Sequence, residues 1–326
     1  MSLVTSLTVV IPIYNGEKWI GRCLDSLFAQ ELRGRELQVV AVDDGSKDGT
    51  AEILDSYSAR EKRLHIIHQA NQGTAAALTA GIQMATGDVV GVISQDCFAA
   101  PDWMASVADA FEADDKIGIV RGQVLPAGEI NVPICHCTYV LKPSRSYDGV
   151  TIAFRAAALD QVGRCYDVSL SRAGDDADIG WRVVEAGWQD HWIDRPLSFH
   201  EVIPLTFWRA LGQIKAAARM PLLVRKHPGM RARLKLRFLA GSPWQYIRLS
   251  CLAMTLLTAV LTIWSLAALL IVLTCALYVI EAVQQEMIQC SPKGKFLTLP
   301  AYMFVSETLG EMMLCWGSLR YNSLVL

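Results

Sequence analysis

The cysteines of this chain lack the spacing of a zinc site or a redox motif. The sequence has nine cysteines in 326 residues, but no CxxC pair occurs. The "CHC" at Cys135, His136 and Cys137 has no second pair of ligands to complete a tetrahedral zinc site. The pattern therefore predicts free thiols in a reducing compartment.

Two nucleotide-binding signatures are also missing. No GxGxxG follows the first strand-like segment, and no GxxxxGK[ST] occurs. The main sequence evidence for a dinucleotide-binding oxidoreductase or a P-loop NTPase is therefore missing. Residues 1–201 contain 17 Lys and Arg against 28 Asp and Glu, without a basic stripe interleaved with aromatic residues. Nucleic acid is therefore not expected as a partner.

Charged residues and helix breakers are absent from one long segment. From Leu249 to Ile280, 32 residues pass without an Asp, Glu, Lys, Arg, Gly or Pro. This run exceeds the roughly 20 residues that an α-helix needs to cross a bilayer, and a soluble core helix is rarely so long and so apolar. We expect a transmembrane segment over residues 244–286. Its length is compatible with one tilted span or with a two-helix hairpin.

Acidic residues are absent from residues 202–280, which contain ten Lys and Arg. Most of these basic residues precede the apolar run, and we expect a basic juxtamembrane helical collar over residues 209–243. The positive-inside rule places such a flank in the cytoplasm, and its charge favours contact with the lipid bilayer. We therefore expect an inner-membrane protein with residues 1–208 on the cytoplasmic side, and an interfacial tail at residues 287–326.

Residues 1–208 alternate between strand-like and helix-like patterns. The expected strands cover residues 7–14, 37–44, 64–69 and 88–94, and the expected helices cover residues 18–30, 46–60 and 74–85. Continuous apolar strands that alternate with helices predict an α/β domain with a mostly parallel sheet covered on both faces. Polar residues follow these strands, and ligands of open α/β sheets bind beyond the carboxyl ends of the strands.

Five motifs along this domain carry a resemblance to a known family. They are "IPIYNG", "VDDGSKDGT", "NQGTAAALTAGIQMATGD", "SQDCFAAPDW" and the block "VTIAFRAAALDQVGRCYD…AGDDADIGWRVVEAGW…SFH". In this order, over about residues 7–201, they resemble the family 2 glycosyltransferases. The resemblance implies the GT-A fold and a nucleotide-diphosphate sugar as donor.

The first two motifs are expected to bind the nucleotide. The Tyr14 ring can lie against a base, and Asp43 or Asp44 can accept a hydrogen bond from a pyrimidine N–H or a ribose hydroxyl. A capped turn built by Ser46 and Asp48 would explain "DDGSKDGT" in part, but not two adjacent carboxylates directly after a strand. The resemblance implies a donor pocket formed by Pro12, Tyr14, Asn15, Asp43, Asp44, Gly73 and Gln95.

The family carries an Asp-x-Asp motif at a fixed distance before Pro101, which in this chain falls on Ser94, Gln95 and Asp96. Ser94 replaces the first carboxylate, and Asp96 keeps the second. The resemblance implies that Asp96 and His200 hold Mg²⁺ or Mn²⁺, although a histidine after a strand is often structural. A magnesium site can work with one carboxylate, substrate phosphates and water. The Ser-x-Asp form resembles that of rhamnosyltransferases.

The acidic stretch "GDDADIGWR" matches the family's Glu-Asp-x-Asp motif, with Asp175 in place of Glu. The resemblance implies that Asp176 is the general base of an inverting reaction, and that Asp175, Asp178 and Arg182 complete the site. Acidic residues at a helix N-terminus are favoured by the helix dipole alone, but three in four residues exceed that need.

These implications together predict a metal-dependent glycosyltransferase that transfers a single sugar to a membrane-associated, lipid-linked glycan for cell-envelope or exopolysaccharide synthesis. Gln213 lies where processive synthases carry Gln-x-x-Arg-Trp, but no Arg-Trp follows it, which argues against polymer extrusion. Two alternatives remain: transfer of the sugar to polyprenyl phosphate itself, and a non-catalytic glycosyltransferase-like membrane scaffold.

Overall fold

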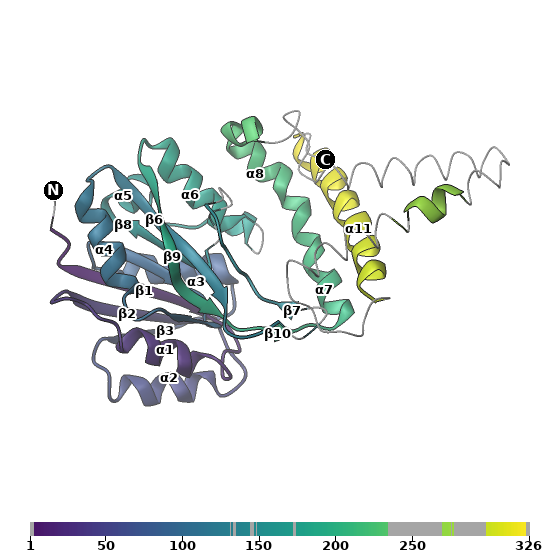
Figure 1. The fold of residues 1–326 in the computed structure, drawn as a ribbon. Coiled ribbons are helices and arrows are strands. Elements are labelled where there is room, and N and C mark those ends of the chain that lie inside the picture. The colour runs from purple at the N-terminus through teal and green to yellow at the C-terminus, as the bar shows by residue number, and fades with distance from the viewer. Residues whose placement is uncertain are drawn as a thin grey trace. The chain divides into compact units, whose positions relative to one another are not determined.

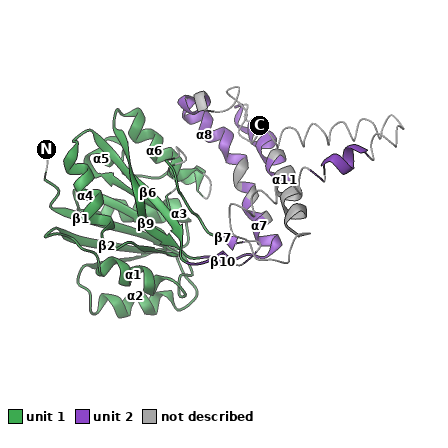
Figure 2. Cartoon of the chain, in the orientation of Figure 1, with its two compact units in different colours: residues 1–127, 137–201 green, residues 128–136, 202–326 purple. Residues whose placement is uncertain are grey.

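The computed structural model describes residues 3–130, 132, 135–143, 147, 149–171, 174–233, 269–274, 276 and 298–323. The chain divides into two compact units (Figure 2). Unit 1 comprises residues 1–127 and 137–201, and unit 2 comprises residues 128–136 and 202–326. The first unit thus ends at Glu201, and residues 202–208 belong to the second.

Unit 1 is built on an eight-stranded sheet with helices on both of its faces (Figure 1). Its strands are β1 (Ser6–Ile13), β2 (Glu36–Asp43), β3 (Leu64–His68), β4 (Val89–Ile93), β5 (Cys97–Ala99), β6 (Ile117–Pro126), β8 (Thr151–Arg155) and β9 (Gln189–His200). Its helices are α1 (Ile20–Phe28), α2 (Thr50–Ser58), α3 (Thr74–Met84), α4 (Trp103–Ala113), α5 (Ala156–Val162), the 3-10 turn η1 (Val168–Leu170) and α6 (Asp175–Glu185).

The strand order is β3-β2-β1-β4-β8-β6-β9-β5. The first four strands are the ones expected from the sequence, and they pair in parallel as predicted. The other half of the sheet is mixed, because β8 is antiparallel to both β4 and β6, and β5 is antiparallel to β9. The expected parallel sheet is therefore confirmed for only half of the strands. Sequence patterns did not reveal this change of direction, because a buried strand reads the same in either orientation.

Both faces of the parallel half are covered. Val9 and Ile11 of β1 join the core formed with α1 and α4, whereas Val10 points to the opposite face. On that opposite face α3 lies against the sheet at Gly81, where an added Cβ would come within 2.3 Å of the Val10 side chain. Helix α3 can pack this closely only because Gly81 has no side chain.

Arg155 joins three elements inside unit 1. It ends β8, is 9% exposed, and its Nε donates to the Ile117 carbonyl at 2.8 Å. Its Nη2 donates to the carbonyls of Phe111 at 2.7 Å and Asp114 at 3.1 Å. A single guanidinium thus satisfies acceptors at the C-terminus of α4 and at the start of β6, where a positive charge also complements the helix dipole.

Unit 2 contains α7 (Phe207–Ile214), η2 (Lys215–Arg219), α8 (Met220–Lys226), η3 (Pro228–Arg233), α11 (Thr298–Tyr321) and a small sheet of β7 (Cys135–His136) with β10 (Ile203–Pro204). Helix α11 packs on η2, where an added Cβ at Gly317 would lie 2.1 Å from the Ala218 carbonyl oxygen. Arg225 also donates to the Tyr321 carbonyl at 2.9 Å. Within unit 2, part of the expected interfacial tail is therefore a helix packed on part of the basic collar.

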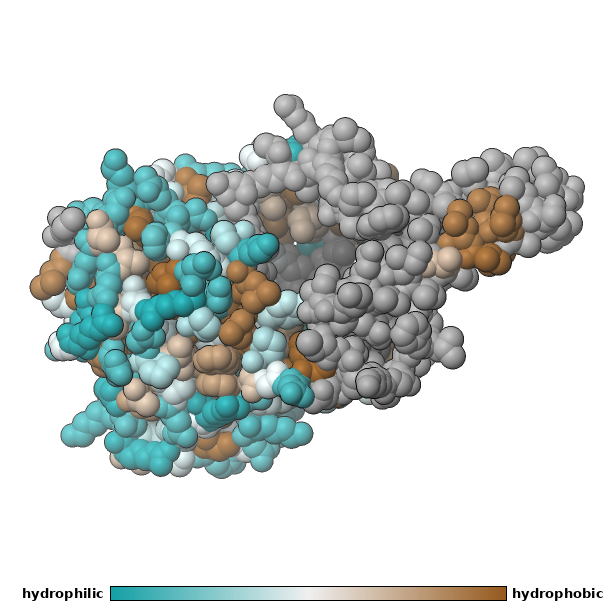
Figure 3. All heavy atoms as spheres, viewed as in Figure 1, coloured by the Kyte–Doolittle hydropathy of each residue, from teal (hydrophilic) through white to brown (hydrophobic). Residues whose placement is uncertain are grey.

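The expected transmembrane segment, residues 244–286, lies outside the described residues except for 269–274 and 276. Among the described helices, none has both the length and the apolar character required to cross a bilayer. Four of the described residues 269–273 carry exposed apolar side chains, namely Leu269, Ile271, Val272 and Leu273, and Figure 3 shows this segment as a hydrophobic cluster.

Replacing Arg155 by Met is expected to lower the free energy of unfolding by about 3 kcal/mol, because the carbonyls of Phe111 and Ile117 lose their buried hydrogen bonds to the guanidinium. Urea unfolding of the full chain in detergent, followed by tryptophan fluorescence, measures this change. Arg33→Met is the matched control: Arg33 is half-exposed and pairs with Asp109 at the surface, so its loss should cost about 0.5 kcal/mol or less. Equal unfolding midpoints for Arg155→Met and the wild type would contradict the assigned role.

Candidate functional site

Asn15 ties the loop after β1 to the loop after β2. Its backbone, at a φ of 51°, donates to the Ser46 hydroxyl at 2.9 Å, and its side-chain Oδ1 accepts from the Lys47 N–H at 2.8 Å. Ser46 therefore does not cap α2 as expected, because it is used for this contact. Asp48 does accept from the N–H of Thr50, the first residue of α2, at 3.2 Å. The capped-turn interpretation thus accounts for Asp48 alone.

The Asp44 carboxylate is buried, at 2% exposure, and organises the loop that precedes α3. Its Oδ1 accepts from the Gln69 amide at 2.7 Å and from the Gln72 N–H at 2.8 Å, and its Oδ2 accepts from the Gly73 N–H at 2.7 Å. Gly73 has a φ of +89°, which favours glycine. The structure thus gives Asp44 and Gly73 a role in shaping the loop beside the expected nucleotide pocket.

Asp43, the last residue of β2, is oriented by two contacts. Its Oδ1 accepts from the Ser46 N–H at 2.9 Å, and its Oδ2 lies 3.0 Å from His68 Nδ1. Burial raises the pKa of Asp43, but the hydrogen bonds from Ser46 and His68 outweigh it and hold the pKa below its usual value. Asp43 is 4% exposed, whereas Tyr14 and His68, the partner of Asp43, are about half-exposed, so the His68 ring beside the Asp43 carboxylate is accessible. Pro12 is close by, because it pairs with Val42 in the β1–β2 register.

Gln95 links the loop after β4 to the loop after β1. Its Oε1 accepts from the Tyr14 N–H at 2.9 Å, and its Nε2 donates to the Tyr14 carbonyl at 3.2 Å. The amide is packed so closely that an added Cβ at Gly16 would lie 2.7 Å from Oε1. Gln95 was expected to bind the donor, and the structure directs its amide to the backbone of Tyr14.

Asp96 and His200 are brought together by the pairing of β5 with β9. Cys97 lies directly opposite His200, and the Glu201 N–H donates to the Asp96 carbonyl at 2.9 Å. His200 Nε2 is 3.7 Å from Asp96 Oδ2. His200 Nδ1 lies 2.7 Å from the Glu201 carbonyl oxygen, which can only accept a hydrogen bond, so Nδ1 carries a proton and Nε2 is the ring nitrogen that faces Asp96.

The donor set at this point fits a divalent cation. A carboxylate oxygen of Asp96, the Cys97 sulfur and a ring nitrogen of His200 lie within 4.8 Å of one another. Burial, and next the Asp96 charge, raise the pKa of the Cys97 thiol well above its usual value. Asp96 and His200 were expected at this site from the sequence, whereas Cys97 was not. The feature of the sequence that could have identified Cys97 is its position directly after Asp96, at the start of a strand.

Asp176 lies in the first turn of α6, after Gly174 with a φ of 101°. Its Oδ2 accepts from the Gly149 N–H at 3.1 Å, and an added Cβ at Gly149 would fall 2.2 Å from its Oδ1. The bare backbone of Gly149 thus orients a half-buried carboxylate. Asp175 is more deeply buried, at 6% exposure.

Asp178 and Arg182 form an ion pair inside the fold. Asp178 is fully buried, and its Oδ2 accepts from Arg182 Nε at 2.8 Å. Arg182 also donates to the carbonyls of Val162, at 2.8 Å, and Cys165. These contacts attach the loop after α5 to α6. The structure therefore uses the two residues to hold the helix that carries Asp176.

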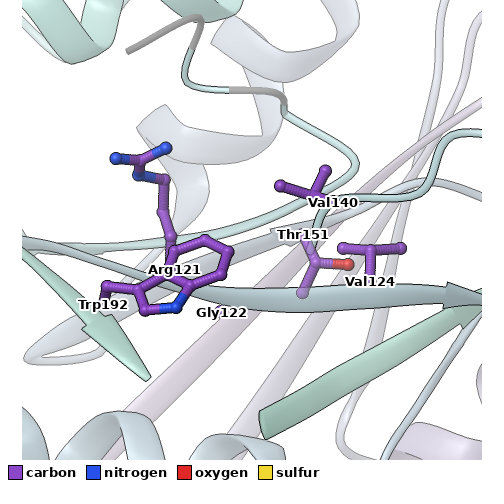
Figure 4. Close-up of a pocket in the computed structure, with 6 residues that line it drawn as sticks. All are labelled: Arg121, Gly122, Val124, Val140, Thr151 and Trp192. Atoms are coloured by element: carbon purple, nitrogen blue, oxygen red, sulfur yellow. The ribbon is translucent and has the colours of Figure 1, made fainter. Parts of the chain in front are cut away.

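A separate hollow lies between β6, β8 and β9 (Figure 4). It contains about 200 Å³, open solvent included. This is below the range of roughly 300–1,000 Å³ that is usual for small-molecule pockets. It is lined by Arg121, Gly122, Val124, Val140, Thr151 and Trp192. None of these six residues was expected in the site, and the hollow is too small to be treated as a ligand pocket.

Comparisons with known proteins identify the family of the chain. A model of the glycosyl transferase family 2 matches residues 8–132, and a model of glycosyl transferase family group 2 matches residues 84–280, more than half of the chain. The chain is 35% identical over 94 residues to the uncharacterized glycosyltransferase EpsJ of Bacillus subtilis, covering 29% of this chain and 27% of that protein. It is 32% identical over 117 residues to the chondroitin synthase of Escherichia coli, covering 36% and 17%. Less than a third of either relative is matched.

Solved structures share the fold at low sequence identity. The mannosyltransferase PcManGT of Pyrobaculum calidifontis, in complex with GDP-Man and Mn²⁺, is similar with a TM-score of 0.53 and 18% identity, over 95% of this chain and 88% of that one. TarS 1-349 of S. aureus, in complex with UDP, is similar with a TM-score of 0.51 and 15% identity, over 98% and 92%. These likenesses support the GT-A fold. With the family match over more than half of its length, the chain belongs to the family 2 glycosyltransferases.

Proposed function

We propose that this glycosyltransferase is inverting and metal-dependent, and that it transfers a single sugar from a nucleotide-diphosphate donor to a membrane-associated, lipid-linked glycan acceptor. The observation that carries the proposal is the β5–β9 pairing, which faces His200 Nε2 toward the Asp96 carboxylate at 3.7 Å. Asp96 and His200 would hold Mg²⁺ or Mn²⁺. A bound cation would neutralise charge on the leaving diphosphate.

The remaining groups divide between donor and acceptor. Asp43 stays anionic because its pKa is lowered, and it can accept a hydrogen bond from the base or ribose beside the exposed Tyr14 ring. Asp176, oriented by the Gly149 N–H, accepts the proton of the acceptor hydroxyl as that oxygen attacks the anomeric carbon. Six further residues contribute indirectly, because they hold the loops and the helix that carry these groups: Asn15, Asp44, Gly73, Gln95, Asp178 and Arg182.

A transfer to glycans of the cell envelope or of exopolysaccharides agrees with the relatives, which include a chondroitin synthase. Ser94, in place of a carboxylate, gives specific support to the alternative of a non-catalytic scaffold, and a polyprenyl-phosphate acceptor remains the other alternative. The retained Asp96, His200 and Asp176 favour catalysis.

Activity of the full chain with a panel of nucleotide sugars tests the proposal. With Mn²⁺ present, at least one donor should release its nucleoside diphosphate, and a chelator should abolish the release. Asp96→Asn should lower the rate by about 100-fold or more, because one carboxylate ligand is lost. Asp102→Asn, which removes a partly exposed carboxylate paired with Arg195, should leave the rate unchanged. Donor binding without turnover across the whole panel would favour the scaffold.

Replacing Asp176 by Asn is expected to slow sugar transfer by about 10²–10⁴-fold, which is the usual contribution of a general base. Donor affinity should remain within about twofold, since Asp176 is assigned to the acceptor rather than the nucleotide. Asp160→Asn is the control, because Asp160 is exposed and pairs only with Arg164 among the contacts described. An Asp176→Asn protein with full transfer rate would refute the assignment.

We also propose that the chain is anchored in a membrane with its catalytic unit on the cytoplasmic side. The support is the uncharged run from Leu249 to Ile280 and the excess of basic residues that precedes it. Trp208, at 78% exposure beside this basic segment, is a residue type favoured at membrane interfaces.

The full chain should sediment with membranes after cell lysis and resist extraction by high salt or alkaline carbonate, because an apolar span is held by more than charge. Detergent should release it. Recovery of the full chain in the soluble fraction without detergent would contradict the anchor.

A further inference from the structure

We propose that Cys97 is a third ligand of the cation site, so that the site prefers Zn²⁺, Co²⁺ or Cd²⁺ to Mg²⁺. This rests on the proposed role of Asp96 and His200 as metal ligands. The ligand atoms of the three residues lie within 4.8 Å of one another. Two ligands of one tetrahedral zinc ion, each about 2.0–2.3 Å from the metal, are about 3.3–3.8 Å apart. The distance of 3.7 Å between Asp96 Oδ2 and His200 Nε2 falls within that span.

The backbone prearranges this set. Cys97 and His200 are direct partners in the antiparallel register of β5 and β9, and directly opposed residues project to the same side of the sheet. The Glu201 N–H, bonded to the Asp96 carbonyl at 2.9 Å, extends the pairing by one step. Three potential ligands therefore come from two strand ends that are hydrogen-bonded to each other. His200 contributes an imidazole whose Nδ1 is already bonded to the Glu201 carbonyl.

Burial and charge also favour a cation. Cys97 is 2% exposed, His200 is 1% exposed, and the Asp96 side chain is 13% exposed. A divalent ion bound by the Asp96 carboxylate, the Cys97 thiolate and a neutral His200 imidazole has no net charge, which suits a buried position. As the metal–sulfur bond forms, the S–H bond breaks and its proton passes to solvent.

The ligand types decide which cation is preferred. Magnesium prefers oxygen ligands, whereas thiolate and imidazole suit zinc and related ions. Ser94 stands where the family pattern has a carboxylate, so one hard oxygen ligand is missing from the sequence. Carboxylate oxygen, thiolate sulfur and imidazole nitrogen are each ligand types that zinc binds in proteins.

A Cd²⁺ titration of the full chain in detergent tests this inference. The wild type should develop a thiolate-to-cadmium charge-transfer band in the ultraviolet. Cys97→Ser should lose the band and bind Cd²⁺ about 100-fold more weakly, with Mg²⁺ affinity changed less than about threefold. Cys23→Ser and Cys137→Ser are matched controls from the same neighbourhood, because Cys23 Sγ contacts the Ser94 carbonyl and Cys137 Sγ contacts the His200 carbonyl. Both should keep the band.

A band that survives in Cys97→Ser would overturn the inference. Absence of the band in the wild type, with Mn²⁺-dependent donor turnover intact, would overturn it and leave the proposed function standing. Absence of both would count against the Asp96–His200 site itself. If Cys97→Ser does not fold, X-ray absorption spectroscopy of the zinc-loaded wild type tests the assignment. One sulfur ligand would support it, and a ligand set without sulfur would refute it.

Discussion

The antiparallel pairing of the three-residue strand β5 with the end of β9 is the interaction on which the candidate site depends. It places His200 beside Asp96 although the two residues are about a hundred positions apart in the chain. Backbone hydrogen bonds between the two strands fix the positions of Asp96 and His200 more firmly than side-chain contacts alone could, because both strand ends are held at the site. The local pairing therefore sets the geometry available to a cation.

In the loops at the carboxyl ends of β1, β2 and β4, several residues that were expected to bind the donor bind other parts of the loops instead. Gln95 bonds the backbone of Tyr14, Asn15 bonds Ser46 and Lys47, and the Asp44 carboxylate accepts three hydrogen bonds from the loop before α3. A buried carboxylate without donors would be costly, so these contacts stabilise the loops and fix their shape. Of the two expected nucleotide-binding residues Tyr14 and Asp43, the structure leaves the Tyr14 ring exposed and buries the Asp43 carboxylate, at 44% and 4% exposure.

The first turns of α6 show the same division. Asp178 and Arg182 pair with each other and hold the loop after α5. Asp176, two residues earlier on α6, is oriented by a backbone N–H from a segment near 149. Residues two positions apart on a helix point in different directions, so one motif supplies both a buried ion pair and a half-buried carboxylate.

The sequence by itself determined the four parallel strands, their covering helices and the family. Apolar periodicity and ordered motifs depend on local residue types, and those are read directly from the chain. It also indicated Asp96, His200 and Asp176, since their positions relative to Pro101 and to the strands match the family pattern. Only the tertiary structure decided the antiparallel half of the sheet, the structural use of Gln95, Asp44 and Arg182, and the place of Cys97 beside Asp96 and His200. Strand direction and side-chain partners arise from contacts between residues distant in sequence, and a one-dimensional pattern does not record them.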